Sequence, residues 1–125
     1  MHSFDAVFGP KKSDGSPARI YHFPSGDIDT AIALYWKKYD ISLNVKNNWN
    51  SLKEDLEGKA YVSVGNQDNF LLNHAVHLLD DEMKKISANF VFAYYPGDHF
   101  TLMTPEYRAK GYQFLQERYY AFKKK

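Results

Sequence analysis

One aspartate and one histidine draw attention because each directly follows a predicted strand. Asp68 comes after the apolar run Ala60–Val64 and its Gly65 turn, and His99 comes after the apolar run Asn89–Tyr94. A carboxylate that bonds one imidazole nitrogen fixes the tautomer and stabilises the imidazolium, which leaves the other nitrogen free to act as a general base. Together, these two residue types are suited to hydrolysis.

The segment that joins the two residues predicts how they are positioned. Apolar residues recur at helical spacing from Asn69 to about Ile86. A strand, a crossover helix and a second strand of one sheet are parallel, so the two carboxyl ends share an edge, where open α/β sheets bind ligands. Neighbouring strands lie about 4.8 Å apart. We therefore predict a βαβ unit over Lys59–Thr104 in which the side chains of Asp68 and His99 meet.

Two segments precede this unit. Residues 1–26 combine turn clusters of Gly, Pro, Ser and Asp with apolar residues, which predicts an ordered but irregular arm. A short strand over Ala18–His22 is the alternative. Residues 27–58 are predicted to form a helical insertion, and Asp27 or Asp29 is expected to cap its first helix.

The second helix of the insertion and the closing helix complete the predicted fold. The helical pattern of Ile41–Leu56 is interrupted near Asn47-Asn48. Thr104-Pro105 has the residue types of a helix start, so residues 59–125 are predicted as strand, helix, strand and helix. The expected fold class is α/β, with two parallel strands and flanking helices, and we expect residues 1–125 to form one structural unit.

Composition narrows the classes of function. Sixteen basic and fifteen acidic residues give a net charge of +1, so no overall field favours nucleic acid or an anionic membrane. The absence of cysteine excludes disulfides and thiolate chemistry. No apolar run approaches the roughly 20 residues that span a bilayer, and no signal-peptide pattern is present. We therefore predict neither a nucleic-acid nor a membrane partner, and the compartment stays open.

Other polar groups were weighed as sites. His74, His77 and Asp81 are spaced to share a helix face, but their pattern is not that of a zinc protease, and we interpret the two histidines as surface residues. The turn at Asp68 lacks the glycine and glutamate of a calcium loop. Side chains of adjacent residues usually diverge, so Asp98 is not the expected partner of His99. No metal and no cofactor are predicted.

Both candidate site residues also have a purely structural interpretation. Asp68 stands where it can cap the helix that starts near Asn69, a role that needs no chemistry. His99 can be a turn residue that bonds to the backbone. Whether the two side chains meet at the carboxyl edge of the sheet separates these interpretations from the catalytic one.

The two turns resemble a known pattern. The stretches Val64–Val76 and Pro96–Phe100 resemble the acid-bearing and histidine-bearing turns of the α/β-hydrolase fold in a group of esterases, and the helix from Pro105 fits the same pattern. Phe4–Gly58 resembles the insertion that precedes the acid strand in these esterases. The resemblance covers nearly the whole chain, but only the carboxy-terminal part of the family fold.

The resemblance implies a role for each residue and a missing third member. The family triad runs Ser, acid, His, with the serine in a Gly-x-Ser-x-Gly elbow ahead of the acid. It implies Asp68 as the acid and His99 as the base. The sequence contains no such elbow. The resemblance therefore implies a serine-hydrolase fragment that begins after the nucleophile and is inactive alone, with the missing amino-terminal half of the hydrolase as its expected partner. Independently of the resemblance, a second copy of the chain is the other expected partner, because it can supply missing strands.

A second class of function remains open. The 21 aromatic residues can instead form the surface of a small non-catalytic interaction or ligand-binding domain. Under either interpretation we expect self-association, because parallel apolar strands are normally buried inside larger sheets and two strands alone leave unpaired edges.

Overall fold

The computed structural model describes residues 2–124 and separates two compact units, Met1–Asn47 and Asn48–Lys125. The boundary falls inside helix α3 (Ile41–Leu56), where Asn48 has the non-helical angles φ −116° and ψ 15°. This confirms the predicted break in that helix. The contacts thus make two units where we expected one, and the division lies before the segment boundary expected after residue 58.

The first unit is mostly helix and turn. It holds α1 (His2–Phe8), α2 (Thr30–Trp36) and the 3-10 turn η1 (Lys37–Tyr39). Asp29 caps α2, because its Oδ1 accepts from the amides of Ala31 and Ile32 at 3.0 and 3.1 Å. Asp29 is therefore the cap, one of the two residues that the sequence predicts for this role.

The first 26 residues differ from the irregular arm that the sequence predicts. They begin with α1, because Phe4 and Phe8 share one helix face and stack on each other at 6.2 Å. Turns follow, and the alternative strand reduces to an isolated bridge between Tyr21 and Ile28. Phe8 also packs on Tyr39, with ring centroids 5.0 Å apart.

The second unit contains the predicted βαβ arrangement. Its elements are β1 (Tyr61–Gly65), α4 (Leu72–Lys85), β2 (Val91–Tyr95) and α5 (Pro105–Lys123). The strands pair in parallel, with Tyr61 opposite Val91 and Gly65 opposite Tyr95. Thr104 caps α5 by accepting from the amide of Tyr107, as the sequence predicts. The mixed α/β class with a two-stranded parallel sheet is thus confirmed.

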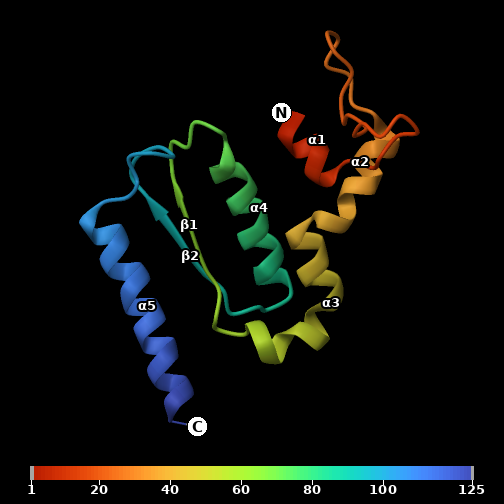
Figure 1. The fold of residues 1–125 in the computed structure, drawn as a ribbon. Coiled ribbons are helices and arrows are strands. Elements are labelled where there is room, and N and C mark those ends of the chain that lie inside the picture. The colour runs from red at the N-terminus through yellow and green to blue at the C-terminus, as the bar shows by residue number, and fades with distance from the viewer. Residues whose placement is uncertain (1, 125) are drawn as a thin grey trace. The chain divides into compact units, whose positions relative to one another are not determined.

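The two helices cover opposite faces of the strand pair (Figure 1). Tyr61 of β1 and Tyr95 of β2 contact the α5 rings of Phe114 and Tyr107, with centroids 5.2 Å apart in both pairs. Tyr94, the neighbour of Tyr95, points the other way and stacks on an α4 side chain. Side chains alternate between faces along a strand, so each helix contacts one set.

Apolar burial is concentrated between these elements. Met83 on α4 is the most deeply buried apolar side chain, with 1% of its surface exposed. The other buried apolar residues of this unit are Trp49, Val64, Tyr95, Leu102 and Phe114. Among residues 2–124, no helix is both long and apolar enough to cross a membrane.

The burial of Met83 predicts a large cost for removing its side chain. Met83→Ala leaves a cavity and is expected to lower the free energy of unfolding by about 2–5 kcal/mol. Leu78→Ala, on the exposed part of the same helix, is the matched control and should change it by less than about 0.5 kcal/mol. Urea unfolding followed by circular dichroism measures both. Equal effects of the two substitutions would contradict this packing.

Candidate functional site

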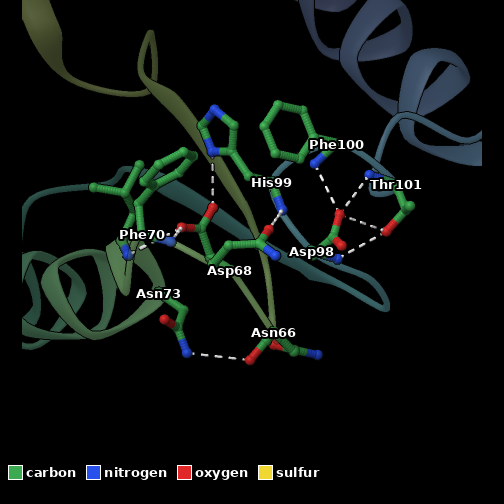
Figure 2. Close-up of polar contacts among 10 residues, drawn as sticks. Asn66, Asp68, Phe70, Asn73, Asp98, His99, Phe100 and Thr101 are labelled. Atoms are coloured by element: carbon green, nitrogen blue, oxygen red, sulfur yellow. Dashed lines mark hydrogen bonds and ion pairs between the residues drawn. The ribbon is translucent and has the colours of Figure 1, made fainter.

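Asp68 and His99 meet where β1 and β2 end (Figure 2). The Nδ1 atom of His99 lies 2.9 Å from Oδ2 of Asp68, which is hydrogen-bond distance. Asp68 is in the turn after β1 and His99 is in the turn after β2, so both come from the carboxyl edge of the parallel pair. The predicted contact between the two side chains is present; their catalytic role stays a prediction.

The second carboxylate oxygen of Asp68 serves the start of α4. Oδ1 accepts from the amide of Phe70 at 2.9 Å and from the amide of Leu72 at 3.3 Å. Asp68 therefore has both predicted roles, because Oδ1 accepts from the amides at the start of α4 and Oδ2 contacts the imidazole of His99. Because both oxygens are engaged, the carboxylate has a fixed orientation towards the imidazole.

Burial and charge differ between the two partners. The Asp68 side chain is 2% exposed, whereas the His99 side chain is 42% exposed. Burial alone raises the pKa of the Asp68 carboxyl, but hydrogen bonds from His99 and from the amides of Phe70 and Leu72 outweigh it and hold that pKa below its ordinary value. An ionised, oriented acid thus faces one side of an imidazole that solvent reaches on the other.

The histidine turn is held by its own acid. Oδ1 of Asp98 accepts from the amides of Phe100 and Thr101 at 2.9 and 2.8 Å, and from the Thr101 hydroxyl at 2.9 Å. The Phe100 amide and the Thr101 groups lower the pKa of the Asp98 carboxyl. Asp98 therefore stabilises the turn, and Asp68 is the acid that bonds the imidazole of His99, as predicted.

Two further contacts join the acid turn to the histidine turn. The Oδ1 atom of Asn69 accepts from the amide of His99 at 3.2 Å, and the amide of Gln67 donates to the Gly97 carbonyl at 3.0 Å. Gly65 permits this approach, since a Cβ there would lie 2.5 Å from the Gly97 oxygen. The glycine that ends β1 is thus required by the meeting of the two turns.

Two phenylalanines that the sequence reasoning missed flank the imidazole (Figure 2). The rings of Phe70 and Phe100 lie edge to face with His99, with centroids 5.0 and 5.3 Å away. Both are exposed, as are Leu71 and Leu72 beside Phe70. We call Phe70, Leu71, Leu72 and Phe100 the apolar rim. In the sequence, an aromatic residue follows each site residue within two positions. Residue type alone, however, does not tell whether such a ring is buried in the core or exposed beside the site.

His77, one of the two α4 histidines considered as metal ligands, packs against a tyrosine. His77 stacks on Tyr94 at 4.3 Å, and the Tyr94 hydroxyl donates to Asp80 at 2.9 Å. Burial and the Asp80 carboxylate raise the pKa of Tyr94 to about 12, so its hydroxyl stays protonated and donates. Within residues 2–124, no three His, Asp or Glu side chains gather closely enough to hold a metal ion.

The close approach at Gly65 predicts that even one added methyl group separates the turns. Gly65→Ala is expected to lower the free energy of unfolding by about 1–3 kcal/mol and to speed amide hydrogen exchange at Gln67. Gly111→Ala is the matched control, because a Cβ at that helical position meets nothing within 4 Å. Unchanged Gln67 exchange in Gly65→Ala would show that the turns do not need this contact.

The lowered pKa of Asp68 predicts that the folded chain loses stability at acid pH. A carboxyl with a lower pKa in the folded than in the unfolded chain contributes stability that is complete above the unfolded value, about 3.9, and is lost as pH falls through the folded value. Asp68→Asn should therefore be clearly less stable than the original chain at about pH 5. This difference should shrink below about pH 4.

Urea unfolding at several pH values measures this difference. Asp81→Asn, on an exposed position of α4, controls for the loss of one negative charge. A stability difference between Asp68→Asn and the original chain that stays constant down to about pH 2 would contradict the assigned environment of Asp68.

Comparison of the chain with protein-family models, with curated proteins and with solved structures found no match. The geometry of Asp68 and His99 is therefore the observation from which a function is proposed.

Proposed function

We propose that this chain supplies the acid and the histidine of a Ser-Asp-His triad in an esterase-like serine hydrolase. The observation that carries the proposal is the 2.9 Å contact between His99 Nδ1 and Asp68 Oδ2 at the carboxyl edge of the parallel strands. Asp68 is the orienting acid and His99 is the general base. The exposed side of the imidazole is the side that faces the reaction.

The contact supports a definite direction of proton transfer. When the Asp68 carboxylate accepts from Nδ1–H, the neutral imidazole carries its lone pair on Nε2. Nε2 takes the proton of a serine hydroxyl as its oxygen attacks the ester carbonyl, and the Asp68 charge stabilises the imidazolium. The imidazolium then gives that proton to the leaving alcohol. A water molecule repeats the sequence on the acyl-enzyme and releases the acid.

The nucleophile and the oxyanion-binding amides are assigned to a different polypeptide segment. The sequence has no Gly-x-Ser-x-Gly elbow, and in this fold the elbow precedes the acid. We therefore assign these groups to the amino-terminal half of a parent hydrolase. Residues 1–125 alone are expected to have no esterase activity above that of an exposed histidine.

The apolar rim supports a class of substrate. Phe70 and Phe100 present exposed rings on both sides of the proposed base. An ester with an apolar acyl or alcohol group removes this surface from water when it binds, at about 25 cal/mol for each Å² buried. A charged group in the same place gains nothing from the rim. The proposed substrates are therefore esters with an apolar group near the scissile bond.

The test uses the longest reading frame that contains this sequence, expressed as one protein. We expect it to encode a Gly-x-Ser-x-Gly elbow ahead of β1 and to hydrolyse p-nitrophenyl esters. Asp68→Asn should lower kcat by up to about 10⁴-fold, because the tautomer of His99 is no longer fixed. Asp98→Asn is the matched control and should lower kcat by less than tenfold, since Asp98 bonds its own turn.

Two results would overturn the proposal. One is a reading frame without a serine elbow whose product has no esterase activity. The other is an active esterase in which His99→Ala leaves kcat unchanged, since a general base contributes about 10²–10⁴-fold.

A further inference from the structure

The turn that carries His99 is almost self-contained. Its amides at positions 98, 100, 101 and 102 bond to groups of the turn itself, which are the Thr101 hydroxyl, the Asp98 carboxylate and the Asp98 carbonyl (Figure 2). The amide of His99 is the exception among residues 98–102, all of which the structure describes, because it donates to Oδ1 of Asn69 at 3.2 Å. This bond connects the backbone of His99 to the acid turn.

The side chain of Asn69 does not serve the helix that follows it. The amides at the start of α4 are bonded by the Asp68 carboxylate, whereas the oxygen of Asn69 accepts from His99. The turn's own amides and hydroxyl lower the pKa of the Asp98 carboxyl most, and a hydrogen bond from the Asn69 side chain adds to this effect. The Asn69 carboxamide is thus directed at the histidine turn through both its oxygen and its nitrogen.

Adjacent residues of the acid turn therefore hold two parts of the same histidine. Oδ2 of Asp68 lies 2.9 Å from Nδ1 of the imidazole, and Oδ1 of Asn69 accepts from the backbone amide. The first contact sets the rotation of the ring, and the second sets the place of the backbone from which the ring projects. The direction of Nε2 is defined only when both are fixed.

The strand that precedes His99 does not fix the backbone of His99 alone. The contact on that side is the Gly97 carbonyl, which accepts from the amide of Gln67 at 3.0 Å. Gly97 has φ 105°, and glycine has more conformational freedom than any other residue. A self-contained turn that follows a glycine needs a further contact to stay in place. The bond from the His99 amide to Asn69 supplies that contact.

We propose that Asn69 positions His99 for proton transfer by holding its backbone while Asp68 orients its ring. Asn69 touches neither substrate nor the reacting atoms and acts only through His99, so it is a positioning residue. This role rests on the proposed function, in which Nε2 of His99 takes the proton of the serine. Without the Asn69 oxygen, the imidazole is still present but is held at one point in place of two.

The residue type at position 69 fits this role. A carboxamide has an oxygen that accepts and a nitrogen that donates, so it can bond the His99 amide and the Asp98 carboxylate at once. A carboxylate in the same place would have no proton to donate and would add a third negative charge beside Asp68 and Asp98. The neutral amide of asparagine avoids both problems.

The first test uses residues 1–125 and needs no activity. By NMR, we expect the His99 amide to exchange about threefold to tenfold faster in Asn69→Ala than in the original chain, which is the effect of one hydrogen bond. The fraction of His99 that carries its proton on Nδ1 should fall as well. Asn66→Ala is the matched control and should change neither, because Asn66 is an exposed asparagine of the same turn whose bonds use backbone atoms.

The second test measures kinetics in the longest reading frame. Asn69→Ala should lower kcat about 10- to 100-fold, since a displacement of about 1 Å costs on the order of 10²-fold. KM should stay within about twofold, because the apolar rim is unchanged and only the geometry of the base is altered. Asn66→Ala should change neither constant. A purely structural role of Asn69 would lower the stability of the enzyme but leave kcat of the folded fraction unchanged.

Several results would overturn the proposal. One is equal kcat for Asn69→Ala and Asn66→Ala in an enzyme that His99→Ala inactivates, and another is a higher KM at constant kcat, which would assign Asn69 to substrate binding. If Asn69→Ala fails to fold, the original chain decides, since a His99 amide that exchanges at the rate of an unfolded chain contradicts the bond and a protected one supports it. Failure of the proposed function looks different: His99→Ala then leaves kcat unchanged, while the His99 amide still responds to Asn69→Ala.

Discussion

The Asp68 carboxylate joins the parts of the second unit that form the site. Its Oδ1 binds the amides at the start of α4, and its Oδ2 binds the imidazole that follows β2. A buried carboxylate is stable only when its oxygens have partners. The turn after β1, the helix start and the histidine turn are therefore linked through one side chain, and the close approach at Gly65 allows them to meet.

Much of this arrangement follows from local rules that the sequence obeys. Apolar runs of strand length separated by a helical pattern lead to a parallel βαβ unit, and parallel strands bring their following turns to one edge. The caps at Asp29 and Thr104 follow from side-chain oxygens that accept from nearby amides. The break at Asn48 falls at a residue type that is unfavourable inside helices. The contact of Asp68 with His99 follows from topology, since it needs only neighbouring strands and short turns.

Other features depend on packing that no local pattern reports. Helix α1 forms in a segment rich in turn residues, where Phe4 stacks on Phe8. The apolar rim was missed because the residue type of Phe70 and Phe100 does not reveal that their rings stand in solvent beside an imidazole. The division near Asn47 depends on the density of contacts between distant segments, which helical periodicity does not contain.

The most direct test of the account is the protonation of the two imidazole nitrogens of His99, measured by NMR on the intact chain. We expect the neutral imidazole to carry its proton on Nδ1, bonded to Asp68, with Nε2 unprotonated and free to accept a proton. Asp68→Asn should abolish this preference. A proton on Nε2 in the original chain, or identical spectra for the original chain and Asp68→Asn, would contradict the assignment of His99 as an oriented base.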